Sequence, residues 1–353
     1  MTSSGAPSTT RVVRLAARPR GVPEPGDFEI AEASLAATAE GEVLVRNLLM
    51  SVDPYMRGRM GGVRTYVEPF QVGETLTGAA VGRIVESRAA GLAVGDLVVS
   101  QMGWRELFTS GPRGLRRLEP GPVPASAHLG VLGMPGFTAW YGVKEVGRPR
   151  QGETVFVSAA SGAVGSVAGQ LAKAGGCRVV GSAGSPEKVV FLLDELGFDA
   201  AFDYHVTPPL DGLREAAPEG IDLYFDNVGG AHLEAAIQHL HDFGRIVACG
   251  MISLYNQSAP APGPANLGLV VTRRLRLEGF IITDHQDRFG EFLVEVAPLV
   301  AGGRLRGRET VVEGIERAPE ALIGLFRGDN VGKMLVRLAA DPGGTSPTGG
   351  RPG

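Results

Sequence analysis

The sequence has few cysteines and no long apolar run, and each absence excludes a class of protein. Its 353 residues include two cysteines, Cys177 and Cys249, which are too few for a disulfide framework. Such a low number fits a reducing compartment, so we expect a cytoplasmic protein. No apolar run reaches the roughly 18 residues that a transmembrane helix needs, so no membrane partner is expected.

An excess of either charge is also absent. The formal net charge is −4 at pH 7, and 20% of the residues are charged while 44% are hydrophobic. These values describe an ordinary globular enzyme and give no sign of a nucleic-acid partner. Because the chain is longer than a single hydrophobic core usually allows, we expect two domains.

The ligands of a catalytic zinc ion are missing from the first part of the chain. Zinc-dependent alcohol dehydrogenases hold the metal with Cys and His side chains, and the metal activates the substrate oxygen. No Cys and no His precedes His128, and no group of four closely spaced cysteines exists. We therefore expect no metal, and the group that activates the substrate must be organic.

Hydrophobic patterning divides the chain into two kinds of structure. Short strands separated by glycine and proline predict a β-barrel-like domain, with strands at 11–15, 42–46, 80–85 and 95–99, after a loose tail at 1–10. From about residue 128, strands alternate with helix-length segments. These strands are expected at 155–158, 178–181, 201–204, 221–225, 245–249 and 277–282. The alternation predicts a doubly wound parallel sheet, the α/β architecture of dinucleotide-binding domains.

The expected domain boundaries follow from these patterns. The barrel-like catalytic domain should cover 1–128 and the dinucleotide-binding domain 129–307. A return to the first domain is expected at 308–340, with strands at 311–312 and 333–336 around a helix at 318–327. The last segment, 341–353, consists mainly of Gly, Pro, Ser and Thr and is expected to be disordered.

A glycine turn after the strand at 154–158 is the candidate phosphate site. The turn contains Ala159, Gly162, Ala163, Val164 and Gly165, and a helical segment follows it. Gly162 allows close approach of a pyrophosphate, and Gly165 allows the helix to pack on the strand. Ala159 occupies the first of the three usual glycine positions, which weakens the motif taken alone. An isolated turn of this kind is as often structural, but the alternating strands favour a dinucleotide site.

The end of the next strand indicates which nicotinamide cofactor is used. An NAD enzyme places an acidic residue there for the ribose 2′-hydroxyl, whereas this chain has Ser182, Ser185 and Lys188. Hydroxyls and a cation suit the 2′-phosphate of NADPH. The alternative is that Ser185 only caps a helix beginning at Pro186 and that Lys188 is a solvated charge, although both interpretations are compatible.

Several longer segments together resemble a known family. They are Asn47–Met60, Gly133–Trp140, Phe225–Gly230, Cys249–Asn256, Gly279–Ile282 and Gly328–Lys333. With the glycine turn, they resemble the leukotriene/prostaglandin reductase branch of the zinc-independent medium-chain dehydrogenases/reductases, over about residues 11–337. That branch includes curcumin-reductase-like and alkenal-reductase-like enzymes.

The resemblance implies a GroES-like barrel beside a Rossmann domain, NADPH as cofactor and a homodimer. It implies that Lys188 and Tyr204 contact the 2′-phosphate, with Asn227, Gly250 and Asn330 along the rest of the cofactor. Two positions depart from the family: Asp203 precedes Tyr204 where Asn is commoner, and Leu254 replaces a polar residue found in several relatives.

The implied reaction is the NADPH-dependent reduction of the carbon-carbon double bond of an α,β-unsaturated ketone or aldehyde. Hydride addition at the β carbon leaves an enolate, whose oxygen needs a hydrogen-bond donor. Tyr55 and Tyr255 are the candidates, because a neutral phenol donates at pH 7 and can relay a proton to the α carbon. The alternative is that both tyrosines serve packing.

Other interpretations remain open at this point. Arg57 and Arg59 are either clamps for a substrate carboxylate or ion pairs at the domain interface. An NADPH:quinone oxidoreductase would use the same fold without metal, although its relatives lack the Asp53–Arg57 signature. A non-catalytic NADPH-binding sensor is the third possibility, because fold alone does not prove catalysis.

Overall fold

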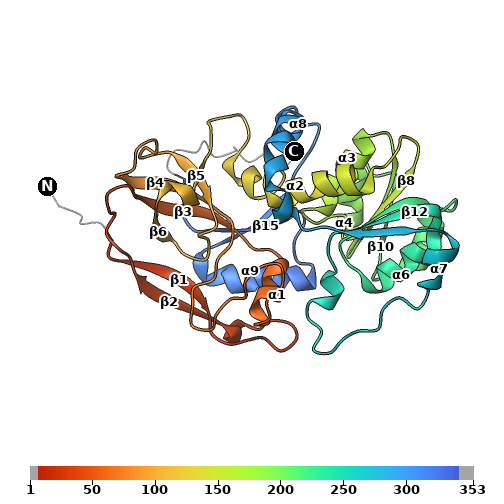
Figure 1. Cartoon of the computed structure of the whole chain (residues 1–353), viewed down its shortest axis with the longest axis horizontal. Helices are drawn as coiled ribbons and strands as arrows, with labels where there is room; N and C mark the ends of the chain where they lie inside the picture. The colour runs from red at the N-terminus through yellow and green to blue at the C-terminus, as the bar shows by residue number, and fades with distance from the viewer. Residues whose placement is uncertain (1–6, 342–353) are drawn as a thin grey trace, which may run out of the picture.

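The computed structural model describes residues 7–341, which form two lobes joined by the C-terminal part of the chain (Figure 1). The first lobe, here the barrel lobe, contains the antiparallel strands, and the second, the nucleotide lobe, contains a parallel sheet. After the nucleotide lobe, the chain returns to the barrel lobe, where β15 (Lys333–Arg337) pairs with β3 (Val43–Ser51) (Figure 1). Side chains of α9 (Ala318–Arg327) and α1 (Tyr55–Met60) share one apolar core there.

The barrel lobe is built from a seven-stranded sheet and a two-stranded sheet. In the larger sheet the order is β14-β15-β3-β4-β5-β7, with β6 also paired to β3, whereas β1 pairs with β2. The strands are β1 (Thr9–Leu15), β2 (Phe28–Ser34), β3 (Val43–Ser51), β4 (Ala80–Ser87), β5 (Leu97–Ser100), β6 (Leu107–Ser110), β7 (Arg116–Arg117), β14 (Glu309–Glu313) and β15 (Lys333–Arg337). Its helices are α1 (Tyr55–Met60) and α9 (Ala318–Arg327).

The nucleotide lobe contains a six-stranded parallel sheet in the order β10-β9-β8-β11-β12-β13. Its strands are β8 (Thr154–Val157), β9 (Arg178–Ala183), β10 (Ala200–Asp203), β11 (Ile221–Asp226), β12 (Leu240–Ala248) and β13 (Arg276–Gly279). Its helices are α2 (Met134–Tyr141), α3 (Gly165–Ala174), α4 (Pro186–Val190), α5 (Pro209–Ala216), α6 (Gly230–His239), α7 (Gly268–Thr272) and α8 (Phe289–Ala301).

Burial on both faces explains why the central strands are continuously apolar. Val155 and Val157 of β8 join a core that includes side chains of α2, α3 and α8. Phe156, which points the other way, belongs to a second core with side chains of α5 and α6. A parallel sheet covered by helices on both faces needs apolar residues at successive positions, and this is the pattern from which the sheet is predicted.

The predicted fold class is confirmed: the chain is α/β, with a doubly wound Rossmann sheet and a GroES-like barrel. Most predicted strand ends differ from the structure by one or more residues, and three of the departures have a clear physical cause. Strand β1 begins at Thr9, inside the segment predicted as a loose tail, because it pairs with β2 as far as Ser34. Strand β13 ends at Gly279 because Phe280 leaves the sheet and packs its ring on Tyr141.

At the C-terminal end, Asp341 was assigned to the disordered segment but accepts hydrogen bonds from the Arg83 guanidinium at 2.5 and 2.9 Å. The remainder of that predicted tail, 342–353, and residues 1–6 lie outside the described residues. Within 7–341, no helix is long and apolar enough to cross a membrane.

Candidate functional site

The turn between β8 and α3 has the backbone expected of a phosphate-binding loop. Ala159 adopts a left-handed conformation, with φ of 45°. A Cβ atom at Gly165 would lie 2.5 Å from the carbonyl oxygen of Ala159, so only glycine fits where α3 begins. The turn thus leads into the N-terminus of α3, and a helix N-terminus of this kind favours an anion such as a phosphate.

The left-handed Ala159 gives a prediction about stability. Left-handed backbone costs an L-residue other than Gly about 1–2 kcal/mol. Glycine also adds entropy to the unfolded chain, which offsets about 0.4–1 kcal/mol of the gain. Ala159→Gly should therefore raise the free energy of unfolding by up to about 1.6 kcal/mol, measured by urea denaturation. Ala160→Gly, at the neighbouring buried position, is the control and should destabilise the protein.

A groove with a volume of about 450 Å³ continues from this turn. Its lining comes from the turn, the ends of β9 and β10, the start of α6 and the α9–β15 loop, and so from both lobes. Of the residues predicted to bind cofactor, the groove is lined by Ala159, Gly162, Lys188, Tyr204 and Asn330. A long groove with a phosphate turn at one side matches an extended dinucleotide.

The donors at the end of the groove suit a 2′-phosphate. Lys188 is only 9% exposed, and its ammonium donates a hydrogen bond to the carbonyl of Gly328 across the groove. Burial lowers the pKa of Lys188, while Asp329 and Asp203 oppose that shift. The Tyr204 hydroxyl lies close to Gly184, since a Cβ there would be 2.8 Å from it. No Asp or Glu lines this groove, so the residues fit NADPH.

The alternative interpretation of this segment had two parts: Ser185 as a helix cap and Lys188 as a solvated charge. Ser185 does cap α4, because its hydroxyl accepts the Lys188 backbone N–H at 3.4 Å. The interpretation of Lys188 as a solvated charge is wrong, because α4 packs the side chain between the two lobes.

The other predicted cofactor residues do not line the groove as it stands. They are Ala163, Val164, Gly165, Ser182, Ser185, Asn227 and Gly250. Ser182 is fully buried within β9, and the Asn227 side chain donates a hydrogen bond to the Ser158 carbonyl at 2.8 Å. Direct contact with the cofactor stays a prediction for each of these seven residues.

Asp226 organises the start of α6 and was missed in the sequence. Its Oδ1 atom accepts hydrogen bonds from the Tyr224 hydroxyl at 2.7 Å and from the backbone N–H groups of Val228 and Gly229 at 2.9 and 2.7 Å. The side chain is fully buried, and burial raises the pKa of its carboxyl. The available signal was an acid at the end of an apolar strand, three residues before the glycine pair Gly229-Gly230.

Tyr55 and Tyr255 come from different lobes and lie in one electrostatic cluster. Tyr55 begins α1, and Tyr255 follows the short 3-10 helix Ile252–Leu254. Burial raises the pKa of both hydroxyls, and Asp53 adds to the shift at Tyr55. Tyr66 adds to the upward pKa shift of Tyr55, and Tyr255 adds to that of Tyr66, which links the three phenols electrostatically.

Tyr66 is a candidate site residue that the sequence did not reveal. Tyr66 as a whole is 57% exposed. Partial burial of its hydroxyl, together with Tyr255, nevertheless raises the pKa of that hydroxyl. The only signal was a tyrosine in the loop between α1 and β4. Its relation to Tyr255, in the other lobe, exists only in the folded chain.

The two cleft arginines are already engaged. Arg57 donates to Gly21 O at 2.8 and 3.0 Å and to Asn256 Oδ1 at 3.1 Å. Arg59 donates to Glu68 O at 2.9 Å and Thr77 Oγ1 at 3.0 Å. Arg57 does lie where the two lobes meet, as the domain-interface interpretation predicts. It makes no ion pair there, because its partners are neutral oxygens and not a carboxylate.

Comparison with known proteins agrees with this geometry. Residues 11–118 match the family described as "N-terminal domain of oxidoreductase", and 163–297 match "Zinc-binding dehydrogenase". The NADPH-dependent curcumin reductase of Escherichia coli is 42% identical over 93% of this chain and 96% of its own length. The NADP(+)-dependent 2-alkenal reductase of Nicotiana tabacum is 43% identical over 91% and 95%. The chain belongs to the leukotriene/prostaglandin reductase branch of the zinc-independent medium-chain dehydrogenases/reductases.

A solved member of this reductase branch extends the likeness to three dimensions. The crystal structure of CurA from Vibrio vulnificus in complex with NADPH has a TM-score of 0.88 and 39% sequence identity, covering 94% of this chain and 100% of that one. One matching family is described as zinc-binding, but residues 7–341 of this reductase contain no group of three or more His, Cys, Asp or Glu side chains placed to hold a metal.

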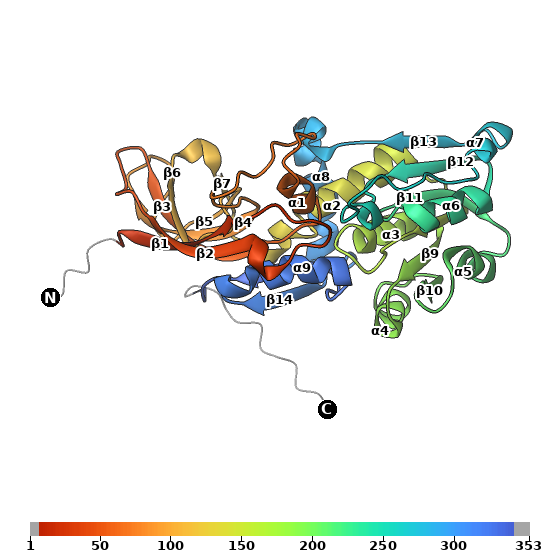
Figure 2. The same cartoon turned by 90° about the horizontal axis from the view of Figure 1, so that it is seen from below.

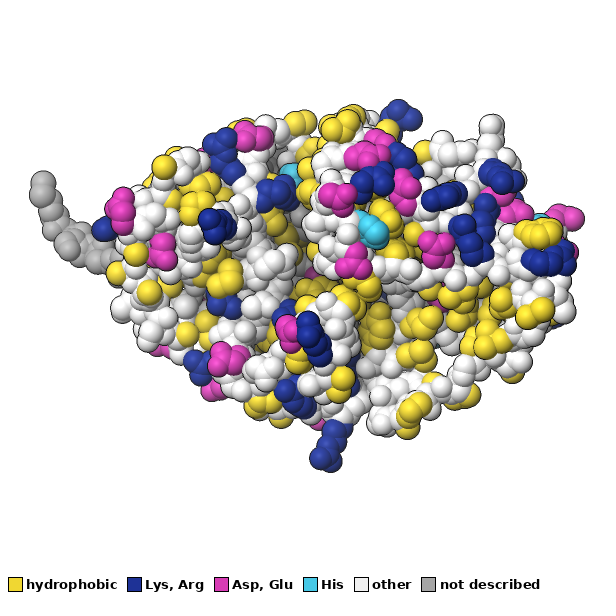
Figure 3. All heavy atoms as spheres, viewed as in Figure 1, with side chains coloured by type: hydrophobic (Ala, Val, Ile, Leu, Met, Phe, Trp, Pro, Cys, Tyr) yellow, Lys and Arg dark blue, Asp and Glu magenta, His cyan; other side chains and the backbone are white. Residues whose placement is uncertain are grey.

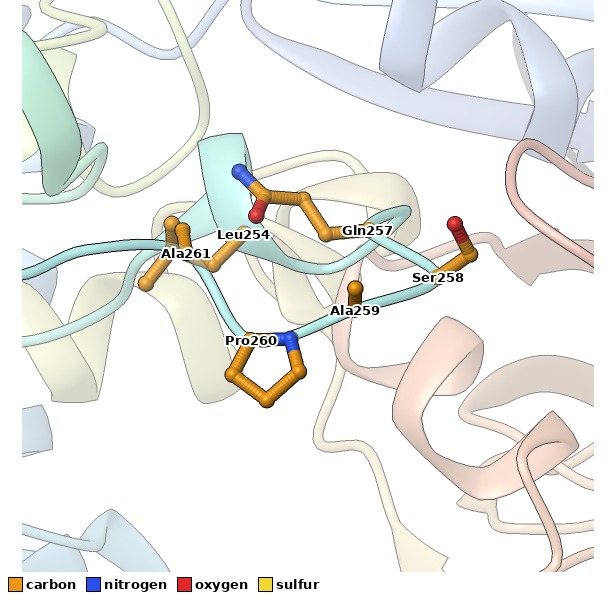
Figure 4. A pocket seen from close by; sticks show the side chains of 6 residues that line it. All are labelled: Leu254, Gln257, Ser258, Ala259, Pro260 and Ala261. Atoms are coloured by element: carbon orange, nitrogen blue, oxygen red, sulfur yellow. The ribbon is translucent and has the colours of Figure 1, made fainter.

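A second, more open depression lies on the loop that follows Tyr255 (Figure 4). It is lined by Leu254, Gln257, Ser258, Ala259, Pro260 and Ala261. None of these side chains titrates, so the depression offers contact surface and no acid or base. On the face seen in Figure 3, hydrophobic side chains also lie along the hollow between the lobes of the reductase.

Proposed function

We propose that this chain reduces the carbon-carbon double bond of α,β-unsaturated ketones and aldehydes with NADPH. The observation that carries the proposal is the position of Tyr255 between Ser253 and Asn256, which both line the nucleotide groove. Its hydroxyl accepts the Met251 N–H at 3.4 Å, and Tyr66 and Tyr55 belong to the same electrostatic cluster. The relatives named curcumin reductase and 2-alkenal reductase support the substrate class.

One group of residues binds the cofactor, and a second group donates hydrogen bonds and protons to the substrate. When bound, NADPH supplies the hydride that adds to the β carbon of the substrate. Lys188 and Tyr204 hold the phosphate-bearing end of the groove, and the turn from Ala159 to Gly165 receives the pyrophosphate. Tyr255 and Tyr55 donate hydrogen bonds to the carbonyl oxygen as negative charge develops on it. Either hydroxyl then relays the proton that reaches the α carbon.

The raised tyrosine pKa values predict the alkaline limb of the pH profile. A phenol donates a hydrogen bond only while protonated, so an upward shift extends donor function to higher pH. We expect kcat for an enone, at saturating NADPH, to stay level from about pH 7 to pH 9.5, relative to the reference tyrosine pKa near 10. A fall centred near pH 8 that disappears in Tyr255→Phe would contradict the assignment.

The proposed reaction is tested by NADPH oxidation with four acceptors: an alkenal, benzylideneacetone, a quinone and a saturated ketone. Oxidation with the first two and none with the saturated ketone, together with a product lacking the double bond, supports the proposal. Faster oxidation with the quinone would favour the quinone oxidoreductase alternative. NADPH binding without turnover of any acceptor would favour a sensor.

We also propose a homodimer joined through the edge of the parallel sheet. Strand β13 lies at the outer edge (Figure 2), is exposed at all four residues and, among the described strands, pairs with β12 alone. Nearby, Val271 is 78% exposed and Leu277 43% exposed. An unpaired edge can bind its own copy about a two-fold axis. Light scattering should give twice the chain mass, and a monomer at micromolar concentration would contradict the assembly.

The compartment and the domain limits remain proposals as well. Both cysteines are free thiols, which supports the cytoplasm. The sheets support a catalytic domain at 1–128 and 308–340 around a nucleotide domain at 129–307.

A further inference from the structure

Arg57 is the point where three segments of the chain meet. It lies in α1, two residues after Tyr55, and is only 7% exposed. Its Nε donates to Gly21 O at 3.0 Å and to Asn256 Oδ1 at 3.1 Å, and its Nη2 donates to Gly21 O at 2.8 Å and Pro19 O at 3.4 Å. One guanidinium thus joins α1, the turn at 19–21 and the loop that carries Tyr255.

The bond to Asn256 crosses between the lobes. Asn256 directly follows Tyr255 and also lines the nucleotide groove. The turn at Gly21 packs against the same residue, since a Cβ at Gly21 would lie 3.7 Å from Asn256 O. Residues 257–263, which follow, are exposed throughout. The Tyr255 loop is therefore held at Asn256, and the residues after Asn256 are not held by packing.

The bonding pattern occupies the Nε and Nη2 donors of Arg57, the edge of the guanidinium that faces the turn at 19–21 and Asn256. Burial lowers the pKa of its guanidinium, although the group remains charged. Oxygen acceptors surround it, and hydrogen bonds from a charged donor are stronger than neutral ones. A substrate carboxylate that took the Nε/Nη2 edge would break the contacts that join α1 to the Tyr255 loop.

We propose that Arg57 is a positioning residue that fixes Tyr255 relative to Tyr55 through Asn256. The proposal rests on the proposed function, because it assigns Arg57 an effect on the step in which Tyr255 acts. It differs from a purely structural role in one measurable way. A positioning residue has no further effect once the hydroxyl that it positions is gone, whereas a structural brace affects both backgrounds equally.

The test is a double-mutant cycle with Arg57→Gln and Tyr255→Phe, measured as kcat for benzylideneacetone at saturating NADPH. Alone, Arg57→Gln should lower kcat roughly 10- to 30-fold. In the Tyr255→Phe background it should lower kcat by less than about threefold. Arg57→Lys keeps the charge but loses the planar fork, so its kcat should fall between wild type and Arg57→Gln.

Arg105→Gln is the matched control. Arg105 is another arginine of the barrel lobe, and it donates to Leu76 O at 3.0 Å and Gly103 O at 3.3 Å within its own lobe. Its effect on kcat should be the same with and without the Tyr255 hydroxyl. Thermal unfolding of each variant verifies that folded protein is compared.

A second pair of variants covers the case in which Arg57→Gln does not fold. Asn256→Asp retains an oxygen that accepts from the guanidinium and should keep most of kcat, while Asn256→Ala should reproduce the Arg57→Gln loss. Multiplicative effects of Arg57→Gln and Tyr255→Phe would overturn the positioning role while leaving the proposed function intact. An unchanged kcat in Tyr255→Phe would overturn the role of Tyr255 and the positioning role together.

Discussion

Replacing Tyr255 with phenylalanine should lower kcat for enone reduction about 100- to 1,000-fold, because that is the usual cost of losing one preorganised donor to an oxyanion. The hydroxyl is placed for this role in a half-buried cluster, where its pKa is raised and it stays protonated. The ring itself remains in the variant, so packing around the short helix Ile252–Leu254 should be preserved.

The measurement separates loss of chemistry from loss of binding. Single-turnover kinetics should show a slower chemical step, while the NADPH Kd from fluorescence titration should stay within about twofold of wild type, since the lost donor acts only on the transition state. Tyr141→Phe is the control: the ring of Tyr141 contacts His285 at 4.1 Å and Phe280 at 5.5 Å and none of the three clustered tyrosines, so the variant should retain wild-type kcat. If Tyr255→Phe turns over normally, the donor must be Tyr55 or Tyr66.

Much of the fold could be predicted because its main signals are local. The apolar strands of the parallel sheet are buried on both faces, and the helix predicted at 318–327 has those bounds in the structure. Strand β2 was missed because most of its residues are exposed or half-buried and it carries Glu29 and Glu32, so no hydrophobic alternation marks it. Its existence depends on pairing with β1.

The site shows the same division between local and long-range information. The phosphate turn and Lys188 could be found because a turn motif and a strand end place them in sequence. The relation of Tyr66 to Tyr255 could not, and neither could the Arg57–Asn256 bond, whose partners are 199 residues apart. Such contacts arise where the two lobes meet, and no local periodicity encodes which loop faces which.

The remaining large effect concerns cofactor choice. Lys188→Gln should lower kcat/KM for NADPH about 30- to 150-fold, which corresponds to roughly 2–3 kcal/mol for a charge-assisted bond to phosphate. The kcat/KM for NADH should stay within about twofold, because NADH lacks the 2′-phosphate. Glutamine can still donate a hydrogen bond to Gly328 O, so the junction between the lobes should be kept.

Lys173→Gln is the control for this charge change, because Lys173 lies on α3, is partly exposed and pairs with Asp199. It should leave both cofactors unaffected. Raising the ionic strength should weaken NADPH binding to wild type more than to Lys188→Gln, since salt screens the missing attraction. Equal losses with NADPH and NADH would instead mean that Lys188 acts only at the lobe junction. In that case, Tyr204 and the α4 N-terminus would have to account for any preference for NADPH.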